Sequence, residues 1–296
     1  MKERVRDLMR GACDLHIHAG PDIVPRLQDV VEVARDARAA GMRALGIKDH
    51  NTNTADRCYV ASQIVPGVDL LGGIVLNRTV GGLNPETVDK AIRLGTKIIW
   101  MPSMDAALTI EKVRVTHETP WLEGFVKKTD PQEGLSVFKG GMEGDEILPE
   151  VLDILKLIAE ADVILDTCHL GARERLALVQ KAKEMGVRKI IVCHPNCSVN
   201  LMPTDVQQEM ARMGALLSYA FLPYMPLFDR QDFRDVAAMI RAVGPENSIF
   251  FKDFGQFPNP TVVEGVRMFI ASLLAVGFSD NEVRAIVCEN FKRLLD

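Results

Sequence analysis

The chain has 296 residues, 47% of them hydrophobic and 25% charged, which is the balance of a globular protein long enough to bury one large core. Its formal net charge of -5 excludes the strongly basic surface that nucleic-acid-binding proteins usually carry. The sequence has no apolar segment of the signal-peptide kind and no apolar run long enough to cross a membrane. The six cysteines lack disulfide-type spacing, as in a reducing compartment. We therefore expect a cytoplasmic protein whose partner is a small molecule rather than nucleic acid or a membrane.

A repeated unit organises the chain: an amphipathic helix, a glycine, and then a short apolar strand. It is clearest at residues 34–50, 91–103, 181–196, 208–221 and 240–254. Glycine just after a helix adopts the left-handed conformation that ends it. The nearly continuous apolar run that follows is typical of a parallel strand covered on both faces.

Eight strands are predicted in chain order, at residues 12–18, 43–49, 69–77, 96–103, 162–168, 188–193, 215–221 and 248–254. Seven helices alternate with them, and two further helical segments, 261–276 and 280–295, follow the last strand. Such alternation produces either an open doubly wound sheet or a closed barrel. Because the number of strands is eight, we predict an α/β fold of the (β/α)8 TIM-barrel type, with residues 1–296 in a single domain.

Residues 105–148 interrupt the alternation between the fourth strand and the next helix. The segment is too long for a plain connecting loop, is rich in charge and glycine, and contains Trp121. In a barrel this position lies over the mouth formed by the carboxyl ends of the strands, where loops carry function. We expect either a small hairpin and lid over the mouth or a mobile surface insertion.

The histidines are concentrated at the predicted strand ends. Of the six, five lie at or just after the carboxyl end of a strand: His16, His18, His50, His169 and His194. Asp253 lies near the end of the eighth strand, and only His117 lies elsewhere, in the insertion. Active sites of (β/α)8 barrels are built from these strand ends. The distribution predicts a functional site at the barrel mouth.

His16 and His18 are separated by one residue, so in a strand both imidazoles lie on the same face and point into the barrel. Two converging neutral imidazoles suit zinc, iron or manganese. One such pair is weak evidence, and a single histidine such as His169 is more often a satisfied core or surface residue. The joint arrangement at one mouth is what favours a metal site.

These residues resemble the pattern of the amidohydrolase superfamily of metal-dependent hydrolases. That pattern has H-x-H after the first strand, single histidines after the fifth and sixth, and an aspartate after the eighth. Here the positions are filled by His16 and His18, His169, His194, and Asp253. The resemblance implies that these five residues hold a divalent metal, zinc before manganese, iron or nickel, and that Asp253 and His194 act in catalysis. Segments 76–85, 166–171 and 252–256 resemble an uncharacterised branch of unknown substrate.

Two departures from the pattern bear on the metal. The fourth strand ends in IIWMPSMDA, without the lysine or glutamate of many binuclear members, so one ion is favoured over two. Lys48-Asp49-His50 resembles the T-D-H segment of PHP-type phosphoesterases. Lys48 and His50 can supply a metal ligand, a bridging lysine or a substrate contact, and His50 can equally be a buried structural residue. We take Lys48 as a candidate catalytic residue and His50 as a candidate substrate contact. Arg78, just after the third strand, is a second candidate for binding an anionic substrate group.

The leading functional hypothesis is hydrolysis of a C–N or C–O bond, in an amide, cyclic amide or lactone of a small polar substrate, by metal-activated water. Three alternatives stay open: a PHP-like phosphoesterase, a metal-dependent decarboxylase, and a metal-binding barrel without catalysis. The sequence determines neither the substrate nor the oligomeric state, so a homo-oligomer also stays open.

Overall fold

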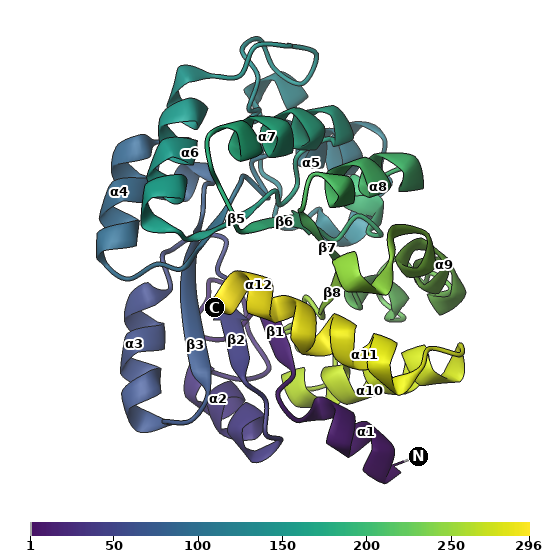
Figure 1. The fold of residues 1–296 in the computed structure, drawn as a ribbon. Coiled ribbons are helices and arrows are strands. Elements are labelled where there is room, and N and C mark those ends of the chain that lie inside the picture. Colours follow the sequence, from purple (N-terminus) through teal and green to yellow (C-terminus); the bar gives the residue numbers. More distant parts are fainter. Residues whose placement is uncertain (1) are drawn as a thin grey trace.

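Eight parallel strands form one sheet in which each strand pairs with the next along the chain (Figure 1). The computed structural model describes residues 2–296. The strands are β1 (Cys13–Ile17), β2 (Ala44–Ile47), β3 (Asp69–Val75), β4 (Ile98–Trp100), β5 (Ile164–Asp166), β6 (Ile190–Cys193), β7 (Leu216–Ala220) and β8 (Ser248–Phe251). Backbone hydrogen bonds from His18 N to Phe254 O and from Asp253 N to His16 O join the ends of β1 and β8. These contacts close the sheet into the predicted (β/α)8 barrel.

Helices surround the strands, as the repeated unit predicts (Figure 1). They are α2 (Val30–Ala39), α3 (Ala55–Ile64), α4 (Pro85–Arg93), α6 (Pro149–Ala161), α7 (Ala172–Glu184), α8 (Thr204–Arg212), α9 (Phe233–Val243) and α10 (Val262–Ala275). At one side of the barrel, α1 (Lys2–Met9) packs against α10 and α11 (Asp280–Val287), and α12 (Lys292–Leu295) follows. None of the helices within residues 2–296 is long and apolar enough to cross a membrane.

Two helix starts that the sequence predicts have the expected caps. The Asn84 side chain accepts hydrogen bonds from the backbone of the first turn of α4, and Pro85 follows it. Ser279 and Glu282 form a reciprocal capping box at α11. These local interactions explain why both helices begin where the sequence indicates.

The strands are shorter than predicted at their carboxyl ends. β5 ends at Asp166 and β8 at Phe251, two and three residues before the predicted ends. Beyond them Cys168 has φ 46° and Asp253 has φ 59°, in the left-handed region that a strand ladder cannot contain. The sequence pattern missed this because the residues that leave the ladder are as buried as the strands.

Residues 105–148 are packed against the barrel. The segment contains α5 (Ala107–Ile110), a π-helical turn over Glu111–Val115, and short 3-10 turns. An antiparallel bridge pairs Phe138 with Ile147. Four of its apolar side chains form a small second core with residues that follow β6 and end β7: Ile110, Val113, Leu122 and Val126 meet Cys197, Val199 and Ala220. The insertion is thus held over the β6–β7 side of the mouth.

Candidate metal centre

Five side chains that the sequence assigns to a metal site meet at the mouth of the barrel. Asp253 Oδ1 lies 3.3 Å from His16 Nε2 and 3.0 Å from His18 Nε2. The His194 ring lies 5.5 Å from the His16 ring and 5.0 Å from the His169 ring, measured between centroids. All five side chains are nearly completely buried. The structure therefore brings together residues that are up to 237 positions apart in the printed sequence.

Three of these atoms, the Nε2 atoms of His16 and His18 and a carboxylate oxygen of Asp253, form a donor set of the kind that holds a divalent metal. The residues offer one ligand atom each within 4.8 Å of one another. Two imidazoles and a carboxylate suit zinc, iron or manganese. This group fits the ion that the sequence predicts.

The hydrogen bonding of His194 leaves the lone pair of its Nε2 atom free. Asn200 Nδ2 donates to the Cys168 carbonyl at 2.9 Å, so its Oδ1 is the atom that faces His194 Nδ1 at 3.0 Å. Because an amide oxygen only accepts, Nδ1 carries the proton, and Nε2 is left with a lone pair. His194 Nε2 is buried and has no hydrogen-bond partner within residues 2–296. A buried unpaired acceptor of this kind fits a metal ligand, whose other ring nitrogen usually donates to an oxygen.

His169 and His50 are each oriented by a hydroxyl group. His169 Nδ1 lies 3.0 Å from Thr109 Oγ1, which comes from α5 of the insertion. His50 Nδ1 lies 2.8 Å from Ser103 Oγ, and its ring stacks on His18 at 4.8 Å. The insertion therefore contacts one predicted ligand directly, while His50 flanks the donor set.

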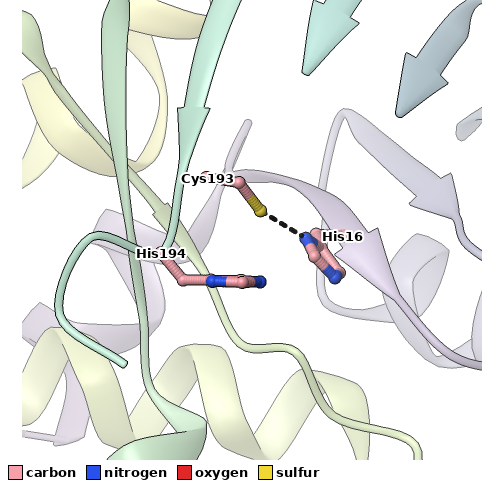
Figure 2. A group of neighbouring side chains, drawn as sticks. All are labelled: His16, Cys193 and His194. Carbon is pink, nitrogen blue, oxygen red and sulfur yellow. Dashed lines mark hydrogen bonds between the residues drawn. The ribbon is translucent and has the colours of Figure 1, made fainter. Parts of the chain in front are cut away.

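Lys48 and Cys193 lie on either side of His16. Lys48 Nζ is 3.1 Å from His16 Nε2 and 3.3 Å from Cys168 Sγ. On the other ring nitrogen, Cys193 Sγ lies 3.4 Å from His16 Nδ1, as Figure 2 shows. Cys193, His16 and His194 form a second group whose ligand atoms lie within 4.8 Å. Burial raises the pKa of the Cys193 thiol well above its usual value, so it stays protonated.

Burial keeps the histidines neutral, as metal binding requires. It lowers the pKa of His18 to about 4 and that of His194 to about 3, and it lowers those of His50 and His169 well below the usual value. Burial opposes ionisation of Asp253, but its interactions with His16 and His18 outweigh this and hold its pKa well below 3.8. At neutral pH the Asp253 carboxylate therefore lies beside the neutral imidazole of His18, with neutral His194 and His169 close by.

The backbone at three strand ends is strained in a way that aims side chains at the site. Cys168, His194 and Asp253 all have positive φ, at 46°, 28° and 59°. Each such residue costs on the order of 1 kcal/mol or more, and strain of this kind clusters at functional sites. Gly255, two residues after Asp253, is required by close approach, because an added Cβ would lie 1.9 Å from the His18 carbonyl oxygen.

Buried charged residues that the sequence analysis missed hold these strand ends in place. Arg175 of α7 donates to the carbonyls of Cys168 and Cys193, the residues immediately before His169 and His194. Asp14 accepts from the His16 backbone N and forms a fully buried ion pair with Lys252. Arg175 joins the ends of the consecutive strands β5 and β6, whereas the Asp14–Lys252 pair joins β1 to the end of β8, and no local pattern signals either contact.

His18, His169, His194 and Asp253 form the floor of a cavity of about 60 Å³. Lys48, His50, Arg26 and Gln256 line its polar part, and side chains from the insertion and from the loops after β6 and β7 form an apolar roof. The roof consists of Met104, Trp121, Leu122, Phe125, Cys197, Val199, Leu222 and Phe228. Arg78 lies outside: it lines a separate groove, and its guanidinium donates to the Glu133 carbonyl. A role for Arg78 in substrate binding stays a prediction.

A protein-family model described as a family of unknown function (DUF6282) matches residues 11–218. The chain belongs to this family. No curated protein matches it in sequence. Its structure is similar to an amidohydrolase from Pseudomonas aeruginosa, with a TM-score of 0.66 and 14% identity over 99% of this chain and 97% of that one.

Two other solved structures are similar over almost their whole length. Organophosphorus hydrolase from Deinococcus radiodurans has a TM-score of 0.58 and 13% identity over 99% of this chain and 94% of that one. 2,6-Dihydroxybenzoate decarboxylase from Rhizobium has a TM-score of 0.57 and 12% identity over 97% and 98%. These likenesses confirm the predicted resemblance at the level of the fold, and a family of unknown function agrees with an uncharacterised branch.

Proposed function

We propose that this chain is a metal-dependent hydrolase that holds one divalent ion, zinc before manganese, iron or nickel, at the barrel mouth. The observation that carries the proposal is the convergence of His16 Nε2 and His18 Nε2 on Asp253 Oδ1, at 3.3 and 3.0 Å. His169 and the unpaired Nε2 of His194 complete the set. One ion is favoured because the nearest carboxylate after β4, that of Asp105, accepts from the Arg78 backbone rather than facing the site.

The reaction that fits this arrangement is attack of water on a polarised carbonyl. A bound divalent ion supplies Lewis acidity and makes water more acidic. Asp253, ionised at neutral pH, accepts the proton of the attacking water and passes it to the leaving nitrogen or oxygen. Cationic Lys48 stabilises negative charge that develops on the substrate oxygen, whereas His194, whose Nε2 carries a lone pair, helps to hold the ion. The apolar roof excludes bulk water, which strengthens these interactions.

We assign the bond as C–N or C–O, in an amide, cyclic amide or lactone. An amidohydrolase is among the structures with this fold, which supports this choice without deciding it. Decarboxylation is the second candidate, because a decarboxylase shares the fold and because an apolar roof destabilises a carboxylate more than the carbon dioxide it releases. A phosphoesterase or a non-catalytic metal-binding barrel would retain the same donor set.

A substrate panel on the metal-loaded protein tests the proposal. Metal-free protein is reconstituted with zinc, manganese, iron(II) or nickel and is then assayed on lactones, cyclic amides, linear amides, phosphoesters and aromatic carboxylates. We expect turnover of a lactone or amide that disappears in Asp253→Asn. Turnover of phosphoesters alone, or carbon dioxide release alone, would replace the hydrolase proposal by the corresponding alternative. No turnover with any metal would favour the non-catalytic barrel.

A further inference from the structure

Arg26, which sequence patterning did not single out, occupies a distinctive place in the cavity. It lies in the loop after β1, and its side chain is only 4% exposed. Arg26 lines the cavity beside His18, His50 and Gln256. Buried arginines are rare unless they are paired, so the partners and the free donors of Arg26 indicate what it binds.

Only one side of the Arg26 guanidinium is occupied. Nε donates to Asp22 Oδ2 at 2.7 Å, and Nη2 lies 2.6 Å from the same oxygen. Within residues 2–296 the recorded side-chain contacts of Arg26 run to Asp22 through these two nitrogens, and none involves Nη1. Because a guanidinium has five N–H donors in a fixed fork, this leaves donors suited to a carboxylate.

The loop that carries Arg26 is tied to the loop after β8. Leu27 N donates to Gly255 O at 3.0 Å, and Arg26 pairs with Gln256 in an isolated antiparallel bridge. Gly255 in turn lies against the His18 backbone. Arg26 is therefore held at a set position relative to Asp253 and His18, as a group that orients a substrate must be.

The charges of the cavity favour an anion. The basic residues Arg26 and Lys48 are matched in number by the acidic residues Asp22 and Asp253, and a divalent ion at the donor set would add two positive charges. A substrate that carries a carboxylate would offset part of this excess in a poorly solvated site.

Opposite the polar groups, the roof offers an apolar surface of the size of one ring. Trp121 and Phe228 meet edge to face at 5.2 Å, and Phe125 lies in the same wall. Flat aromatic side chains of this kind bind the body of a small cyclic molecule. The cavity of about 60 Å³ has no room for a large substrate.

We propose that Arg26 binds the carboxylate of a small, ring-sized acid whose apolar body lies against Trp121, Phe125 and Phe228. The reacting bond of this acid would face the donor set. The position of that bond rests on the proposed hydrolase function, whereas the carboxylate subsite does not. The substrate class is thus a small cyclic carboxylic acid that carries a lactone or amide bond.

Benzoate and its neutral isostere benzamide are suitable probes, because they differ in charge and hardly in shape. Binding of each to the zinc-loaded protein is measured by calorimetry. We expect benzoate to bind at least about tenfold more tightly than benzamide, as one charge-assisted contact predicts. Arg26→Gln should remove this preference, because benzoate loses much more affinity than benzamide.

Two further variants keep the test decisive. Arg35→Gln removes the same charge from the exposed face of α2 and should leave the preference intact. Arg26→Lys, which keeps the charge but not the fork, should retain part of the preference even if Arg26→Gln proves unstable. Equal binding of the two probes by the wild type, or an equal loss for both in Arg26→Gln, would overturn the proposal.

The outcome is separable from that of the proposed function. Calorimetry requires no turnover, so selective benzoate binding by a protein that hydrolyses nothing would support the Arg26 subsite and contradict the hydrolase. Turnover of neutral lactones without any preference for benzoate would support the hydrolase and contradict the Arg26 subsite.

Discussion

The floor and the roof of the cavity differ in how they arise from the sequence. The floor consists of side chains at strand ends, such as His18, His169 and Asp253, which the barrel topology brings together. The roof consists of apolar side chains from the insertion and two loops, held by packing between segments distant in sequence. A repeating fold therefore determines the chemistry of the floor, while irregular segments determine the shape of what can bind there.

The largest effect is expected from removing two of the predicted metal donors. His16→Ala/His18→Ala should lose bound metal by a factor of at least about a thousand in affinity, because two direct ligands disappear. The fold should persist, since the two imidazoles are a small part of the core. Elemental analysis and circular dichroism measure the two quantities. His117→Ala, an exposed histidine of the insertion, is the matched control and should retain its metal.

Gly255 tests whether the floor depends on close backbone contact. Gly255→Ala should destabilise the fold by roughly 2–4 kcal/mol, because φ is 140° and the new Cβ would meet the His18 carbonyl at 1.9 Å. Denaturant unfolding measures the loss. Gly11→Ala, where φ is 80° and nothing lies within 4 Å, should cost only about 1 kcal/mol. Equal losses of stability in the two variants would mean that the positive φ alone, and not the contact with the His18 carbonyl, makes Gly255 necessary.

Thr109, in α5 of the insertion, contacts the predicted metal ligand His169. Thr109→Val removes the hydroxyl that lies 3.0 Å from His169 Nδ1 and keeps the side chain's shape. We expect about a 10- to 100-fold loss of metal affinity, as for other groups that orient metal-binding histidines. Competition with a chelator measures it. Thr116→Val, at an exposed position of the insertion, is the control and should leave metal affinity unchanged. An unchanged affinity in Thr109→Val would show that the insertion does not influence metal binding through His169.

The last prediction concerns pH and the metal-free floor. Folding lowers the pKa of His18 to about 4 and that of His194 to about 3, so the folded state favours the neutral forms. Their contribution to stability is complete above the unfolded pKa of about 6.5 and is lost as pH falls from there towards 4. The free energy of unfolding of metal-free protein should fall by up to about 1.4 kcal/mol per pH unit for each histidine, and its melting temperature should fall with it. His194→Asn should flatten this dependence, and a profile equal to that of the wild type would contradict it.

The sequence predicts the barrel because the strand–helix unit repeats along the chain, and it predicts the donors because they lie at the ends of those strands. Alternating apolar strands and glycine-terminated helices are a local signal, and the strand ends of a barrel share one mouth. Asp14 and Thr109 are not predicted, because Asp14 pairs with Lys252 and Thr109 contacts His169, each far along the chain. Arg175 is not predicted, because its two carbonyl contacts depend on how α7 packs against the ends of β5 and β6. Arg26 was missed for a similar reason: its burial depends on the loop after β8, which nothing near residue 26 reveals.

The central claim is that the barrel mouth holds a divalent ion on histidine nitrogens and the Asp253 carboxylate. Titration of metal-free wild-type protein with cobalt(II), followed by visible and near-ultraviolet absorption, tests it most directly. We predict saturation at one equivalent and ligand-field bands of a nitrogen and oxygen site, without an intense sulfur-to-cobalt charge-transfer band. No binding, or a strong charge-transfer band indicating that Cys193 is a ligand, would contradict the account.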